Sequence, residues 1–312
     1  MATSAPFLRS AAITLGWLIV SVSTGGAQNP SLPTENIIVS APGLAPDTAL
    51  HDFVKSYTAA SQVSGKTARW RAGICPVITG LPQKAGELVT DRVRQIAGMV
   101  DAPVAAQSCK PNIDIVFTLN PQVLLNGVRS KTPILLGYHD VAQEERLATV
   151  THPLQAWYTT QTVDFHGSAY VDDRLCKNCG MYIPSASGVV FVPDARAFAV
   201  TGSRLGDGLS SELYHVIIVV DLAKVAGHTL GGLADYVAML SLAQTQAFEV
   251  CEPVASITNL VSPGCDAGVK TSEITGSDLA YLHALYSIDP RGSFLQQQGD
   301  IAYQMKKGLE KR

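Results

Sequence analysis

Residues 214–243 read YHVIIVVDLAKVAGHTLGGLADYVAMLSLA, and this stretch decides the fold prediction. Its first part, residues 214–220, is rich in β-branched side chains and is the strongest strand signal of the chain. Asp221 follows and is able to cap a helix that we expect to run to about Ala247. Within it, residues 234–243 are apolar on nearly every side, which is typical of a buried helix. We therefore expect a strand that leads into a central, buried helix.

A βαβ unit is predicted upstream of this stretch. Residues 68–75 and 112–119 have the composition of strands, and residues 83–100 between them have the spacing of an amphipathic helix. Strand, helix and strand in this order form a parallel pair joined by a crossover. The face that the helix is expected to bury consists of Val89, Val93, Ile96 and Val100.

Further elements complete an α+β domain with a mixed sheet. We expect helices over residues 46–60, 121–128, 278–286 and 294–309, and strands over residues 156–160, 189–192 and 197–200. The sequence has no internal repeat and no long linker. Residues 28–66 are expected to form a leader and a helix, and residues 67–312 a single domain.

The first 27 residues are typical of a secretory signal peptide. Arg9 supplies a positive start, residues 10–23 are uncharged and mostly apolar, and Gly25-Gly26-Ala27 offers a small-residue cleavage site. This apolar core is too short for a comfortable membrane span, although a retained anchor is the alternative. We therefore expect an exported protein, periplasmic or extracellular, with no integral membrane association once residues 1–27 are removed.

Composition favours a globular protein and argues against nucleic acid as a partner. Hydrophobic residues make up 46% and charged residues 16% of the 312 positions, which is enough for a large core. The formal net charge is -3, and removal of residues 1–27 takes away one Arg and no acid, which gives -4. A mildly acidic chain of mixed signs has little attraction for nucleic acid or for an anionic membrane.

All six cysteines lie after the predicted signal peptide. An even number in an exported chain favours disulfides, and proximity favours the pairs Cys75–Cys109, Cys176–Cys179 and Cys251–Cys265. The CxxC motif of Cys176 and Cys179 is alternatively a redox pair or half of a zinc site. Residues 180–184 make a poor helix start and no second CxxC follows, so a structural disulfide is the favoured interpretation.

The order of motifs in residues 211–290 resembles the metzincin type of zincin metalloprotease. In that family a helix reads His-Glu-x-x-His-x-x-Gly-x-x-His, its His side chains bind zinc, and its Glu activates a water. Here residues 227–231 (Gly-His-Thr-Leu-Gly) follow the strand, residues 256–259 (Ser-Ile-Thr-Asn) stand where the Met-turn would be, and residues 278–286 resemble the closing helix. The resemblance implies a zincin-like fold.

Little of the family's catalytic equipment carries over. His228 matches the second zinc-binding His, and Gly231 matches the Gly of the motif. The other motif positions hold Lys224 for the first His, Val225 for the Glu, Ala234 for the third His and Thr258 for the Met of the turn. A protonated Lys has no lone pair for zinc, and Val cannot transfer a proton. The resemblance therefore implies a zincin-like scaffold that has lost its zinc peptidase site, which is a pseudoenzyme.

A different metal site at the same place is an alternative. If residues 221–247 are helical, His228 and Asp235 lie on one face of the helix, and a His with a carboxylate can bind a metal ion. His215 on the preceding strand or His283 on the closing helix would complete the set. An isolated His in a buried helix more often forms a structural hydrogen bond. We therefore favour no metal and no cofactor, with zinc as the alternative, and expect Asp235 to pair with a neighbour or cap a loop.

The favoured hypothesis is a non-catalytic protein that binds a peptide or protein partner. The binding cleft would be bordered by the strand at residues 214–220, because zincins bind their substrates by strand addition at a sheet edge. Three alternatives stay open. They are a metal-dependent hydrolase of the peptidase kind that uses His228 and Asp235, a thiol oxidoreductase that uses Cys176 and Cys179, and a structural envelope protein.

Overall fold

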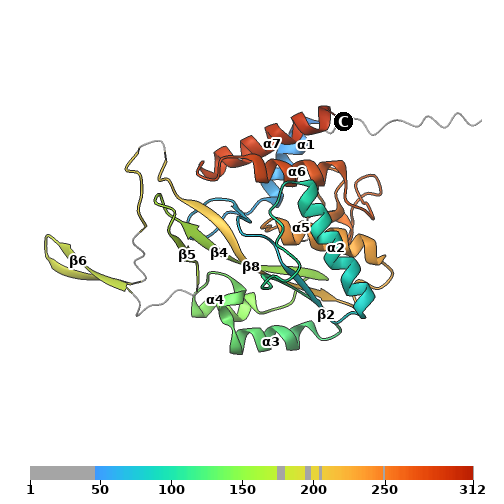
Figure 1. The fold of residues 1–312 in the computed structure, drawn as a ribbon, viewed down its shortest axis with the longest axis horizontal. Helices are drawn as coiled ribbons and strands as arrows, with labels where there is room; N and C mark the ends of the chain where they lie inside the picture. The colour runs from blue at the N-terminus through green and yellow to red at the C-terminus, as the bar shows by residue number, and fades with distance from the viewer. Residues whose placement is uncertain (1–45, 174–179, 194–197, 204–205, 249, 312) are drawn as a thin grey trace, which may run out of the picture. The chain divides into compact units, whose positions relative to one another are not determined.

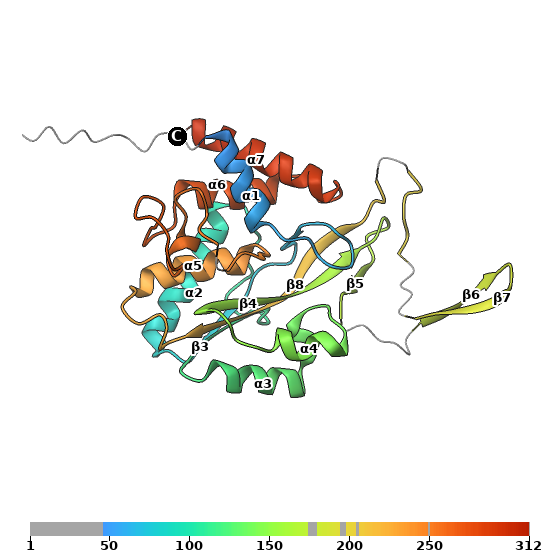
Figure 2. The same cartoon turned by 180° about the vertical axis from the view of Figure 1, so that it is seen from behind.

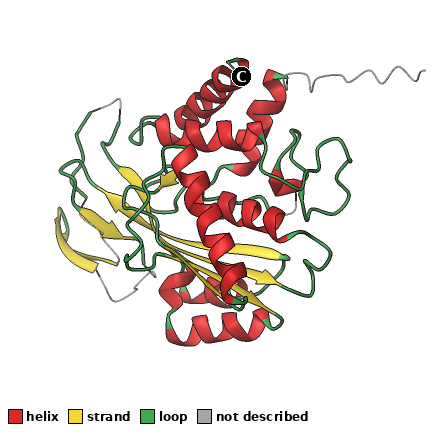
Figure 3. Ribbon diagram, turned by 45° about the vertical axis from the view of Figure 1, so that its right-hand side comes forward, coloured by secondary structure: helices red, strands yellow, loops and turns green. Residues whose placement is uncertain are grey.

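A computed structural model describes residues 46–173, 180–193, 198–203, 206–248 and 250–311 (Figure 1). Residues 44–312 form one compact unit of helices around a mixed sheet, which confirms the predicted α+β class (Figure 3). The predicted signal peptide, residues 1–27, lies outside the described residues.

The strand with the strongest sequence signal, β8, lies in the middle of the central sheet. The strand order is β2-β3-β8-β4-β5, and β1 pairs with the start of β8. β1, β2, β3 and β8 run parallel, whereas β4 is antiparallel to both β8 and β5. The bounds are β1 Ala68–Arg69, β2 Pro76–Thr79, β3 Ile113–Thr118, β4 Leu154–Val163, β5 Ala169–Val171 and β8 Ser210–Asp221.

Helices cover both faces of this sheet, which explains why β8 is apolar without alternation (Figures 1 and 2). Val216, Ile218 and Val220 face a large core built with α1 Asp47–Tyr57, α2 Gln83–Met99, α5 Leu230–Leu242, α6 Gly276–Ser287 and α7 Phe294–Glu310. Ile217 and Val219 face a smaller core built with α3 Pro121–Lys131, the 3-10 helix η1 Pro133–Leu136, and the loop after α4 Val141–Leu147.

The predicted βαβ unit is present as β2, α2 and β3, whose two strands are adjacent and parallel. All four side chains expected on the buried face of its helix, Val89, Val93, Ile96 and Val100, have no exposed surface. Helix α1 packs against α7, and the Nζ of Lys306 lies 2.6 Å from Oδ2 of Asp47. The helix predicted within residues 28–66 therefore belongs to the same compact unit as residues 67–312.

The central helix begins later than the sequence predicts. Asp221 caps a turn, because its Oδ1 accepts a hydrogen bond from the Ala223 N–H at 3.1 Å. The chain then turns at Gly227, whose φ of 93° suits a residue without a Cβ. Thr229 caps the helix, accepting from the Gly232 N–H at 3.1 Å. The prediction of a helix over residues 221–247 was therefore wrong at both ends, since α5 spans only Leu230–Leu242.

Two strand predictions also need correction. The strand expected over residues 68–75 is reduced to Ala68–Arg69, and the next strand begins at Pro76. Residues 198–200 form no strand, and Ala197 lies outside the described residues. The strand expected over residues 189–192 is confirmed as part of β7 Gly188–Pro193, which pairs with β6 Gly180–Ser185 in a separate two-stranded sheet.

Two of the three expected disulfides are confirmed. Cys75 is bonded to Cys109 and Cys251 to Cys265, whereas Cys176 and Cys179 lie outside the described residues. Among the residues that are described, no helix combines the length and the apolar character needed to cross a membrane. The two disulfides are compatible with an exported protein.

Candidate functional site

Asp235 is the only carboxylate of helix α5, and both of its oxygens are engaged. Its Oδ1 accepts from Nε of Arg92, and its Oδ2 accepts from Nη2 of Arg92 at 3.1 Å and from the Ile274 N–H at 2.8 Å. The Asp235 side chain is 3% exposed. These contacts connect α2, α5 and the segment before α6, so the carboxylate ties three parts of the core together.

His228 does not share a helix face with Asp235. It lies, half-buried, in the turn before α5, because the helix begins only at Leu230. Lys224 and Val225 lie in the same turn. Nζ of Lys224 is 3.8 Å from Oδ2 of Asp221, and Val225 is buried. The residue-by-residue match of positions 224–228 to a zinc-binding helix was therefore wrong, since these positions are not helical.

The other predicted metal ligands have partners elsewhere. Nε2 of His215 lies 3.3 Å from Oδ2 of Asp114 on the neighbouring strand β3. Nε2 of His283 lies 3.2 Å from Oδ2 of Asp101. Within the described ranges, no three His, Cys, Asp or Glu side chains are grouped so that they could hold a metal ion.

The predicted strand-addition cleft has no free edge along residues 216–220. β8 pairs with β3 on one side over Val216–Asp221 and with β4 on the other side over Ser210–Val220. Both backbone edges of β8 are therefore occupied by this chain itself over Val216–Val220, so the expected groove is not open along that part of the strand.

The segment expected at the place of the Met-turn does pack against helix α5. It forms a short 3-10 helix, η2 Ile257–Asn259, capped by Ser256. The Ser256 hydroxyl donates to Oδ1 of Asp278 at 2.5 Å, and the Ile257 N–H donates to Oδ2 at 2.9 Å. Asp278 also closes the first turn of α6, and burial raises its pKa. One buried carboxylate thus fixes the turn to the closing helix.

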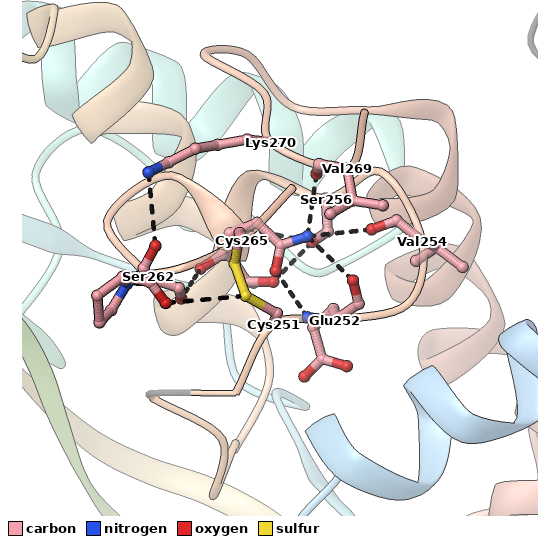
Figure 4. Close-up of a disulfide and its surroundings, with 11 residues drawn as sticks. Cys251, Glu252, Val254, Ser256, Ser262, Cys265, Val269 and Lys270 are labelled. Atoms are coloured by element: carbon pink, nitrogen blue, oxygen red, sulfur yellow. Dashed lines mark hydrogen bonds between the residues drawn. A yellow bond between two sulfur atoms is a disulfide. The ribbon is translucent and has the colours of Figure 1, made fainter. Parts of the chain in front are cut away.

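This turn is part of the loop that the Cys251–Cys265 disulfide closes (Figure 4). The Asn259 amide donates to the carbonyls of Glu252 and Val254 in the loop and of Val269 after it. These bonds fix the conformation of the loop. The Glu252 carboxylate points out of the loop (Figure 4), and its Oε2 accepts from the Ser56 hydroxyl of α1 at 2.5 Å. Burial raises the pKa of Glu252 to about 7.

A pocket of about 440 Å³ opens where β1 meets the start of β8 and the loop after α6. We call it the arginine pocket and define it by Arg69, Arg71, Ser211, Glu212, Asp289 and Arg291. Register brings the first four together, since Ala68 pairs with Ser211 and Arg69 with Glu212. The loop between α6 and α7 supplies the last two.

The arginine pocket is not predicted by any pattern in the sequence. Its residues come from three segments that lie far apart along the chain, and pairing of the short strand β1 with β8 brings them together. The one local signal is Arg69-Trp70-Arg71, in which two positive charges flank a residue of the core. That pattern alone does not distinguish a ligand pocket from a solvated strand end.

Comparison with known proteins finds no relative of this chain. No protein-family model, no curated protein and no solved structure matches the chain.

Proposed function

We propose that this protein is an exported, non-catalytic domain of zincin-like type that binds a peptide or protein partner. The single observation that carries the proposal is the engagement of Asp235, the only carboxylate on the central helix, by Arg92 and Ile274. Three of the roughly four acceptor sites of this carboxylate are taken by a guanidinium and a backbone N–H, which supports a structural role for Asp235.

The arrangement of the neighbouring elements supports the zincin-like part of the proposal. A parallel strand, β8, leads into the buried helix α5, the turn at η2 packs against that helix, and α6 closes the unit. This is the order in which the resemblance places strand, zinc helix, Met-turn and closing helix. The order of these elements supports the proposal, whereas the residues that would perform catalysis differ from those of the family.

The hairpin of β6 and β7 supports the part of the proposal that concerns binding of a partner. Its described side chains, residues 182–190, are all exposed, and Ile183, Val189 and Val190 are apolar. An isolated two-stranded hairpin is marginally stable in water, and exposed apolar side chains gathered in one segment mark a contact surface. In the described part of the chain β6 pairs only with β7, so a partner protein can add an extended segment to the outer edge of the hairpin.

Metal content tests the non-catalytic part. Residues 28–312 would be purified from an oxidising compartment without a chelator or a histidine tag, and bound metal measured by plasma mass spectrometry. We expect far less than one zinc per chain, and the same Tm with and without chelator. About one zinc per chain, lost in His228→Ala, would overturn the proposal in favour of a metal-dependent hydrolase.

Site-specific crosslinking tests the partner contact. A photoreactive amino acid would replace Val189 of the hairpin, which is 68% exposed, and in a matched control Val123 of α3, which is 70% exposed. We expect a crosslinked second protein from position 189 and none from position 123, with the product abolished by Ile183→Lys. Equal products from both positions, or none from position 189 in cells that export the protein, would contradict the proposed contact.

A further inference from the structure

The arginine pocket carries an excess of positive charge. Three arginines and two carboxylates line it, and the carboxylate of Glu212 is already shared between Arg71, at 3.8 Å, and Nε2 of Gln161, at 2.8 Å. The Arg71 side chain is 66% exposed, so this long ion pair holds it weakly. A negative group that enters the pocket therefore meets positive charge that the chain has not neutralised.

Arg69 is fixed at the wall of the pocket. Its Nη1 donates to the carbonyls of Leu285, at 2.9 Å, and Ile288, at 2.8 Å, at the end of α6. No hydrogen bond from its Nε or Nη2 is found in the described ranges. Burial first, and the neighbouring Arg71 second, lower the pKa of Arg69. A bound anion would offset both effects, because it replaces lost solvation and separates two like charges.

Strand alternation separates the neighbouring Ser211 from the arginines. Ser211 and Glu212 are consecutive in β8 and Arg69 is in register with Glu212, so the Ser211 side chain lies on the opposite face of the sheet. Its hydroxyl is buried without a hydrogen-bond partner among the described residues, and it is not a donor to the pocket.

We infer that the arginine pocket binds a ligand through one singly charged carboxylate group, with Arg69 and Arg71 as its donors. A planar carboxylate matches the two parallel N–H groups of a guanidinium. A doubly charged phosphate fits less well, because Glu212 and Asp289 line the same pocket and repel a second negative charge. This binding site is separate from the hairpin contact and does not depend on it.

The two acids also indicate what lies next to the carboxylate. Glu212 is held by Gln161, and Oδ1 of Asp289 accepts from the Arg291 N–H at 2.9 Å, so both acids keep their positions. Their remaining oxygens are acceptors for an N–H group beside the bound carboxylate. The end of a peptide has this arrangement, and so does a free amino-substituted acid. The volume of the pocket falls within the range of small-ligand sites.

Calorimetric titration of the mature chain with four probes tests the inference. The probes are a short acetylated peptide with a free C-terminus, the same peptide as its C-terminal amide, glycine, and inorganic phosphate. We expect the free-acid peptide or glycine to bind and the amide not to bind. Binding of the peptide alone identifies a chain end as the ligand, and equal binding of glycine identifies a small acid. Tighter binding of phosphate, equal binding of the amide, or no binding of any probe at millimolar concentration would overturn the inference.

One substitution locates the binding in this pocket. Arg71→Gln should weaken binding of the free-acid peptide roughly tenfold, since it removes a donor to a charged group. Arg69 is left unchanged because it also binds the end of α6. The controls are Ser211→Ala on the opposite face of β8 and Arg146→Gln on α4, which should not change the affinity. Unchanged affinity in Arg71→Gln would place the binding elsewhere and overturn the assignment.

Discussion

Two arginines of this protein meet carboxylates in different ways. Arg92 donates hydrogen bonds from Nε and Nη2 to the two oxygens of Asp235. The Asp235 side chain is 3% exposed. Arg71 stays 3.8 Å from Glu212 and is 66% exposed. The first pair is complete within the chain, whereas the second leaves donors for something else. The comparison teaches that the bonds around an arginine, more than its presence, separate a structural tie from a binding site.

Breaking the complete pair should have the largest effect. Arg92→Met leaves the buried Asp235 carboxylate with the Ile274 N–H as its remaining donor. We expect the free energy of unfolding to fall by about 3 kcal/mol, measured by urea denaturation, because an unpaired buried charge is costly. Arg146→Met on α4 is the exposed control and should change it by less than about 0.5 kcal/mol. A loss as small as that of the control would mean that the pair is not a core tie.

Glu252 is a buried acid that has no arginine partner among the described residues and accepts a hydrogen bond from the Ser56 hydroxyl. Its pKa in the folded protein is about 7, against an ordinary value of 4.5. The protonated carboxyl therefore stabilises the fold fully below pH 4.5, and this stabilisation is lost as the pH rises to 7. The difference in pKa corresponds to at most about 3 kcal/mol.

Glu252→Gln tests this dependence. The variant keeps a polar side chain without a charge, so we expect the fall in unfolding free energy between pH 4.5 and pH 7 to become smaller than in the unsubstituted protein. Urea denaturation at several pH values measures the change, with the exposed Glu145→Gln as the control. An identical pH profile in the Glu252 variant would show that another group is responsible.

Two buried serines also differ in whether their hydroxyl groups have a hydrogen-bond partner. The Ser211 hydroxyl has no partner in the described chain, whereas the Ser256 hydroxyl bonds Asp278 at 2.5 Å. We expect Ser211→Ala to leave the unfolding free energy unchanged or to raise it by up to about 1 kcal/mol, and Ser256→Ala to lower it by about 2 kcal/mol. Equal losses in the two variants would mean that Ser211 has a structural role.

The smallest effect is expected at Arg71. Arg71→Gln removes an exposed ion pair, so the unfolding free energy should change by less than about 0.5 kcal/mol while ligand affinity falls. Thermal unfolding with and without the free-acid peptide measures both quantities. A loss of stability comparable to that of Arg92→Met would erase the distinction between the two arginines.

Local patterns predicted the elements of this fold better than their ends. Helix α2 followed from Val89, Val93 and Ile96, because one apolar face recurs at helical spacing and all three are buried. The start of α5 did not follow, because Asp221 caps a turn with the same side-chain bond that begins a helix. Two disulfides followed from proximity along the chain.

The candidate site could not be predicted in the same way. Arg92 and Asp235 meet only when α2 packs on α5, and Arg69 comes beside Glu212 only when β1 pairs with β8. Neither contact has a repeating pattern in the sequence, since each depends on tertiary packing. The sequence does contain the types of residue involved, but it does not say which arginine finds its carboxylate.

The central position of β8 also has a consequence for folding. In the described part of the sheet, β2 and β3 lie on one side of β8, and β4 and β5 on the other. A chain that emerges from its N-terminus can form each pair early, but the two halves join only after residue 221 is available. Contacts between distant residues form slowly, because a long loop must close first. The nascent protein should therefore stay incompletely folded until late in synthesis.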